Sequence, residues 1–187
     1  MTLSDLREQP FELLVELERR ARAAVAAREW RSQEGEEWVG VGFRLGAESF
    51  VADRSDVREV LPVPDLLIRV PGTKGWLRGI ANVRGQLLTV VDLKAFLGGG
   101  VSMSARGARV LVVASRDVPT GLMVDEVVGF RRFNTSDLEG EAPATLIRCE
   151  AYLGGSYRHG AEVWPCFDFQ KLIADEQFLL AGEALEA

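Results

Sequence analysis

Histidine and cysteine are scarce in this chain of 187 residues. It has one histidine, His159, and two cysteines, Cys149 and Cys166, which do not form a Cys-x-x-Cys pair. A zinc cluster, a disulfide scaffold or a Cys/His catalytic set needs more of these residues or a closer spacing. We therefore expect no metal site and no bound cofactor.

Long apolar runs and an excess of basic residues are also missing. The amino-terminal segment carries several glutamates and no apolar core, which argues against a secretory signal or a membrane span. The 22 basic residues are outnumbered by 28 acidic ones, for a net charge of −6, which argues against nucleic acid or an anionic membrane as a partner. We expect a cytoplasmic protein without membrane insertion.

Catalytic groups are not placed together by the sequence. Asp92 and Asp168 each precede a short helical pattern, where a carboxylate suits the N-cap position. The triplet at 98–100 is glycine only, so it lacks the lysine of a phosphate loop and is interpreted as a linker. His159 precedes Gly160 in an expected turn and is predicted to be solvated. No catalytic residue is predicted, and the chain is expected not to be an enzyme.

The first 37 residues differ from the remainder. Apolar residues recur at spacings of three and four up to about residue 30, which predicts a helix, and residues 31–37 form a polar linker. This helix could lie on the body of the protein, stay free, or bind a partner.

From residue 38 the pattern favours short strands. Alternating apolar residues predict a hairpin over 41–52, followed by a helical turn at 53–56 and a break at Pro62 and Pro64. Further strands are expected over 109–114, 120–124, 152–157 and 162–167, and a strand or bend from 125 to about 133. A flexible connection is expected at 98–107, a loop with one helical turn at 134–148, and a helical segment at 168–180.

The stretch 76–97, WLRGIANVRGQLLTVVDLKAFL, predicts a hairpin that leads into a short helix. Its polar tip contains Asn82, Arg84 and Gly85, and the apolar return strand 87–91 is expected to be buried on both faces. Asp92 then caps a helix that ends at Gly98.

A weak internal repeat accompanies this hairpin. Gly79 and Gly85 are spaced like Gly154 and Gly160, and each pair is followed by a strand that ends in an aspartate. The repeat predicts two similar β lobes, each a small barrel with one helix. Chance similarity between two apolar hairpins is the alternative.

The segment WLRGIANVRGQLLTVVDLKAFLG resembles the signature of CheW-type chemotaxis adaptors, which runs through an asparagine and an Arg-Gly turn to Val-Asp-Leu. The similarity extends over residues 38–178, through the Val57-x-Glu59 segment, GLMVDEV at 121–127 and Asp168. Within the family, the leading helix and VPGTKGWLRGIANVRGQLL are most similar to adaptors of type IV pilus, twitching-motility chemosensory systems.

The resemblance implies a mostly β fold, a pair of five-stranded β-barrel subdomains with a few short helices and an N-terminal helix. The implied domains are 1–37, an extension and linker; 38–178, the CheW-like domain; and 179–187, a tail. It also implies a non-enzymatic adaptor between the cytoplasmic tip of a methyl-accepting chemoreceptor and the regulatory domain of a CheA-type histidine kinase. The residues that match the family's partner-binding positions are Val57, Glu59, Gly79, Asn82, Arg84 and Gly85.

Two further expectations concern particular residues. Arg84 is predicted to pair with Glu59 at the docking surface. Trp164-Pro165-Cys166 departs from the family pattern, and because proline cannot donate to a ladder, this strand is expected to be an edge strand or bulged. The alternatives to the pilus adaptor are a flagellar chemotaxis adaptor and, in another class, a ligand-binding β-barrel or a hydrolase.

Overall fold

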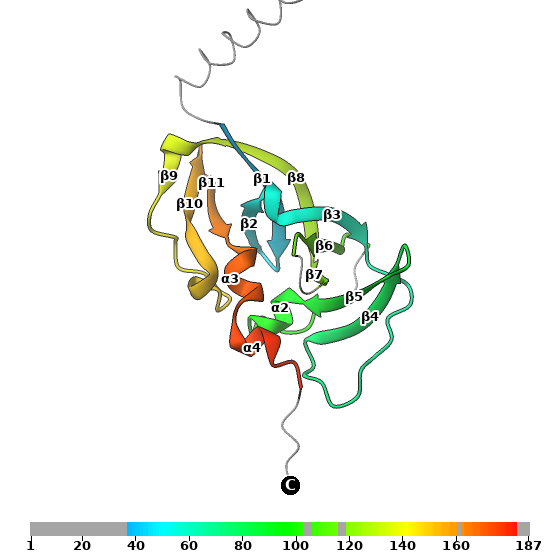
Figure 1. Cartoon of the computed structure of the whole chain (residues 1–187). Helices are drawn as coiled ribbons and strands as arrows, with labels where there is room; N and C mark the ends of the chain where they lie inside the picture. Colours follow the sequence, from blue (N-terminus) through cyan, green and yellow to red (C-terminus); the bar gives the residue numbers. More distant parts are fainter. Residues whose placement is uncertain (1–36, 103–105, 116–118, 161, 183–187) are drawn as a thin grey trace, which may run out of the picture. The chain divides into compact units, whose positions relative to one another are not determined.

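The computed structural model describes residues 37–102, 106–115, 119–160 and 162–182 (Figure 1). The predicted N-terminal helix lies outside the described residues. The chain divides into two compact units, and apart from residues 37–38 and 134–136 the features below belong to the larger one, Val39–Phe133 with Asp137–Ala187.

The described strands form two sheets. The six-stranded sheet has the order β8-β1-β2-β11-β10-β9, and the five-stranded sheet has the order β3-β6-β7-β5-β4. The strands are β1 Glu37–Leu45, β2 Glu48–Asp53, β3 Val57–Pro62, β4 Leu77–Val83, β5 Gln86–Asp92, β6 Arg109–Val113, β7 Thr120–Val124, β8 Glu126–Asn134, β9 Leu138–Glu139, β10 Leu153–His159 and β11 Glu162–Phe167. The helices are α2 Leu93–Phe96, α3 Phe169–Ile173 and α4 Glu176–Leu179, with 3-10 turns at η1 Arg54–Asp56, η2 Thr135–Asp137 and η3 Glu150–Tyr152.

The predicted fold class is confirmed in its main features, because the chain is mostly β, with two sheets and a few short helices. The expected loop at 134–148 contains the predicted helical turn, η2, but also a strand that was not expected. That strand, β9, pairs with β10 through Glu139 and Ser156 and makes one sheet six-stranded instead of five-stranded.

The two sheets repeat one strand arrangement. The order β3-β6-β7-β5-β4 corresponds to β8-β1-β2-β11-β10, and each sheet joins its hairpins through one parallel pair, β5 with β7 and β11 with β2. The predicted duplication is therefore visible in the topology, although the glycine alignment was off by one residue. Gly79 corresponds to Gly155, since both have positive φ, 137° and 122°, beside a register shift.

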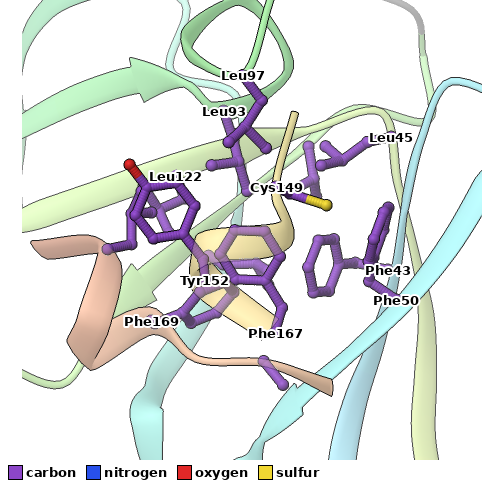
Figure 2. Close-up of a cluster of buried hydrophobic side chains, with 14 of the residues drawn as sticks. Phe43, Leu45, Phe50, Leu93, Leu97, Leu122, Cys149, Tyr152, Phe167 and Phe169 are labelled. Atoms are coloured by element: carbon purple, nitrogen blue, oxygen red, sulfur yellow. The ribbon is translucent and has the colours of Figure 1, made fainter. Parts of the chain in front are cut away.

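A hydrophobic core lies between the sheets and is closed by the short helices. Four phenylalanines from β1, β2, β11 and α3 meet there, with ring centroids 5.7 Å apart for Phe43 and Phe50 and 5.5 Å apart for Phe167 and Phe169 (Figure 2). Leu122 of β7 reaches the same cluster from the other sheet. This shared core fixes the two sheets against each other.

A smaller second core fills the inner face of the five-stranded sheet. Its buried members are Ala81, Leu88, Val90, Val110, Val112 and Met123. On β5, Leu88 and Val90 point into this core, whereas Val91 joins the shared core. The second core thus supports the β4–β5 hairpin from one side.

Two strand predictions are corrected. The first half of β5 is not buried on both faces, because Leu87 is 66% exposed; β7 pairs with β5 only from Thr89 onward, so the hairpin end extends beyond its neighbour. The β11 strand is not an edge strand, since it lies between β2 and β10. Its ladder with β2 begins only at Cys166, after the proline, and the register shift falls on the β10 side, between Leu153 and Ser156.

The predicted caps are confirmed. The Asp92 carboxylate accepts the backbone N–H of Ala95, and the Asp168 carboxylate accepts that of Lys171. The helical segment at 168–180 is split into α3 and α4, because Asp175 caps a second helix through the N–H groups of Gln177 and Phe178.

Candidate functional site

The tip of the β4–β5 hairpin is a two-residue turn. Val83 pairs with Gln86, which leaves Arg84 and Gly85 in the loop with φ values of 51° and 83°. Positive φ at both positions is the type I′ arrangement that matches the twist of a hairpin. The Asn82 side-chain oxygen accepts the Gly85 N–H at 2.9 Å and holds the turn.

Arg84 is an unusual residue for its position. Among the described residues it is the one non-glycine with positive φ. A bulky L-residue in this region carries a strain of about 1–2 kcal/mol, which asparagine or glycine would reduce. Strained residues of this kind cluster at functional sites, so the turn is a candidate on backbone geometry alone.

The predicted pairing of Arg84 with Glu59 is present in the structure. Arg84 Nη1 lies 2.9 Å from Glu59 Oε2, and the side chains are 77% and 23% exposed. Glu59 belongs to β3, at the opposite edge of the five-stranded sheet from β4. The ion pair therefore joins the two edges of the sheet.

A recess lies between these edges. It is lined by Arg58, Glu59, Val83, Arg84 and Gln86. Two guanidinium groups and one carboxylate give this recess a local excess of positive charge, whereas the whole chain is acidic. Sequence reasoning missed Arg58, Val83 and Gln86, although each adjoins or lies close to a predicted site residue.

Not all of the predicted site residues reach the recess. Asn82, Arg84 and Gly85 form the turn, and Glu59 meets them from β3. Val57 is 5% exposed and lies in the shared core. Gly79 is buried within β4, where a Cβ atom would lie 2.5 Å from the carbonyl oxygen of Ile68. These last two positions shape the strands that carry the site.

Exposed apolar side chains lie on the hairpin and on the segment beside it. The Ile68–Ile80 bridge places the 66–70 segment along β4, and Leu66 and Ile68 are 75% and 62% exposed. Leu87 of β5 is also exposed. Exposed apolar side chains on neighbouring segments are typical of protein–protein contact surfaces.

The two cysteines are unsuited to nucleophilic chemistry. Burial raises the pKa of the Cys166 thiol to about 12, and the carboxylates of Asp53, Asp168 and Asp56 add to the shift. Burial likewise raises the pKa of Cys149. Both cysteines are thus poor nucleophiles near neutral pH. His159 is exposed, as predicted, with its ring 6.3 Å from that of Phe133.

An acidic group with structural partners lies at the end of β7. The Asp125 carboxylate accepts the Gly46 N–H at 2.6 Å and the Lys94 ammonium at 2.9 Å. Partial burial raises the pKa of Asp125, but these hydrogen bonds outweigh it and hold the pKa below its usual value.

Within the described ranges, no group of three or more His, Cys, Asp or Glu side chains could hold a metal ion. Likewise, none of the helices described is both long and apolar enough for a membrane span.

Comparison with known proteins identifies the family of the domain. A CheW-like domain matches residues 39–177. The chain is 37% identical to protein PilI of Pseudomonas aeruginosa, over 95% of this chain and 98% of that protein. It is 27% identical to the chemotaxis protein CheW of Thermotoga maritima, over 63% of this chain and 82% of that protein.

A solved structure shares the fold. The scaffolding protein TtCheW of Thermoanaerobacter tengcongensis superposes with a TM-score of 0.63 and 28% sequence identity, over 71% of this chain and 90% of that chain. The domain match, the PilI similarity and the fold together assign the chain. It belongs to the CheW-like family of chemotaxis adaptor and scaffold proteins.

Proposed function

We propose that this protein is a non-enzymatic adaptor that couples methyl-accepting chemoreceptors to a CheA-type histidine kinase in an array that controls type IV pili and twitching motility. The similarity to PilI is the observation that favours the pilus assignment, because it covers 95% of the chain. The similarity to the T. maritima CheW covers 63%, so a flagellar adaptor is the weaker alternative.

The Arg84 turn supports a docking role on physical grounds. An exposed ion pair contributes only about 0–1 kcal/mol to stability, which does not compensate clearly for a strained arginine at the turn. The pair does fix the guanidinium group at the end of a rigid hairpin. The turn therefore suits contact with another protein better than stabilisation of its own fold.

The same proposal covers location. An adaptor of this kind works in the cytoplasm and is recruited to membrane-associated receptor arrays. A fluorescent fusion should form foci with the receptors and become diffuse when the receptors are deleted. Deletion of the gene should reduce twitching zones and leave swimming unchanged.

Direct binding tests the assignment. The full chain is titrated against the soluble kinase and against a receptor tip fragment, and Arg84→Ala is compared with the wild type. We expect binding to weaken about tenfold or more, as for an interface hot spot, with a melting transition that moves little. Arg148→Ala, an exposed arginine near the end of α2, is the matched control.

The outcomes separate the parts of the proposal. If Arg84→Ala binds like the wild type, Arg84 is not a docking residue. If the wild type binds neither the kinase nor the receptor fragment, the adaptor function itself is wrong.

A further inference from the structure

We infer that the recess between β3 and the β4–β5 turn receives an acidic side chain of the partner protein, held jointly by Arg58 and Arg84. This inference rests on the proposed adaptor function and names the chemistry of the contact. It adds Arg58, the middle residue of the Val-x-Glu segment.

The charges in the recess are unbalanced. Arg84 Nη1 lies 2.9 Å from Glu59 Oε2, and because a guanidinium group has five N–H donors, this contact leaves donors for a second carboxylate. Arg58 has no ion-pair partner among the residues that the structure describes. Two positive groups thus face one carboxylate, and a second carboxylate would balance them.

The backbone presents Arg58 toward this position. On β3, Val57 pairs with Val113 and Glu59 pairs with Val112, which leaves Arg58 as the extra residue of a bulge. A bulge redirects a side chain relative to a regular strand and is common beside functional sites. Arg58 is exposed and lines the recess with Glu59 and Arg84.

The remaining lining indicates a protein side chain as the ligand. Val83 offers an apolar wall to the methylene groups of Asp or Glu, and the Gln86 amide offers a further donor. A single exposed carboxylate contact of this kind is too weak to retain a small free anion. The contact becomes effective inside a larger protein interface that excludes water.

The contrast between the acidic chain and the positive recess favours an acidic partner surface. The whole chain has a net charge of −6, whereas two arginines and one glutamate line this recess, so an acidic partner segment is attracted here more than an average position on the chain would attract it. Such a pattern favours one orientation of docking and speeds the encounter at low salt.

Charge reversal tests the inference. Binding of the full chain to the kinase and to the receptor tip fragment is measured at about 50 mM and about 200 mM salt. We expect Arg58→Glu to weaken one of these complexes about threefold to tenfold at low salt, and less at high salt. Arg58→Gln should show a smaller loss, and Arg148→Glu, with the same charge change elsewhere, should bind like the wild type.

A second step identifies the acidic residue. Asp and Glu residues of the affected partner are changed singly to Arg, and one of these changes should restore binding to Arg58→Glu while weakening the wild-type complex. Circular dichroism of each variant confirms folding. Arg58→Gln keeps the test valid if the reversed charge disturbs β3.

The inference is overturned if Arg58→Glu and Arg58→Gln bind both partners like the wild type, or if no acidic residue of the partner couples to Arg58. In either case a loss of binding in Arg84→Ala would leave the adaptor function standing. If the wild type binds neither partner, both proposals fall together.

Discussion

Asp92 and Asp168 occupy the same position in the two sheets. The Asp92 N–H donates to the Trp76 carbonyl at 2.8 Å, and the Asp168 N–H donates to the Tyr152 carbonyl at 2.8 Å. Each carboxylate then caps the helix that follows its strand. The same backbone hydrogen bond and helix cap thus occur in both sheets, with different surroundings.

Because their surroundings differ, we expect removal of the two carboxylates to lower the free energy of unfolding by different amounts. The Asp92 carboxylate is completely buried and also accepts the Ser102 N–H at 2.8 Å. The Asp168 carboxylate is partly exposed, and among the described residues its contacts are the cap and a long contact to the Lys171 ammonium. We expect Asp92→Ala to lower the free energy of unfolding by about 2–4 kcal/mol. Asp168→Ala should lower it by about 1 kcal/mol.

Denaturant unfolding of the two variants, followed by tryptophan fluorescence, measures both values. Equal losses would mean that the second hydrogen bond of Asp92 contributes nothing to stability. Asp92→Asn, which keeps one acceptor oxygen, should recover part of the loss.

Glycine is required at Gly79 and Gly155 by both backbone and space. A Cβ atom at either position would lie 2.5 Å from a carbonyl oxygen, that of Ile68 or of Glu139. We expect Gly79→Ala and Gly155→Ala each to destabilise the fold by about 2–4 kcal/mol, through strain and displacement of the crossing segment.

Gly154 provides the matched control, because it lacks positive φ and a Cβ atom there meets nothing within 4 Å. Gly154→Ala should change the melting temperature little. A larger effect at Gly154 than at Gly155 would contradict the alignment of the two sheets by structure.

Acid should weaken the contact between Asp125 and its donors. The folded-state pKa of Asp125 lies below that of the unfolded chain, which is about 3.9. Its contribution to stability is therefore present above about pH 4 and is lost as pH falls through the lower folded value. Asp125→Asn removes this ionisation.

Denaturant unfolding at several pH values between neutral and acid measures how much stability the Asp125 carboxylate contributes at each pH. The wild type should lose more stability than Asp125→Asn as pH drops below about 4. The control is Asp65→Asn, an exposed carboxylate before β4. Parallel curves for the wild type and Asp125→Asn would contradict the prediction.

Both cysteines should react slowly in the folded protein. With the Cys166 pKa near 12, its thiolate fraction near pH 8 is several hundredfold or more below that of an unfolded thiol of pKa about 8.5. Burial raises the Cys149 pKa as well and blocks access. Iodoacetamide labelling, read by mass spectrometry, should be fast only in denaturant. Rapid labelling of Cys166 in the native protein would show that β11 opens readily.

Local signals in the sequence were sufficient for the hairpins, the caps and the repeated pattern. Apolar alternation marks β1 and β2, an aspartate before a helical pattern marks each cap, and a polar tip with glycine marks the β4–β5 turn. These features depend on the backbone preferences of residues that are close together in the sequence, so the local residue types are enough to predict them. The Arg84–Glu59 pair was foreseen through family resemblance, not through spacing.

Features that depend on distant segments required the tertiary structure. The position of β11 inside its sheet follows from its parallel pairing with β2, more than a hundred residues earlier, so the proline alone was misleading. The burial of Val57 follows in the same way from the core shared by both sheets.

The site shows the same division. The sequence by itself determined a glycine-supported turn that carries Arg84, because turn chemistry is local. Only the tertiary structure brought β3 against that turn and turned Arg58 toward the recess through a bulge, since strand pairing and register depend on the packing of the whole sheet.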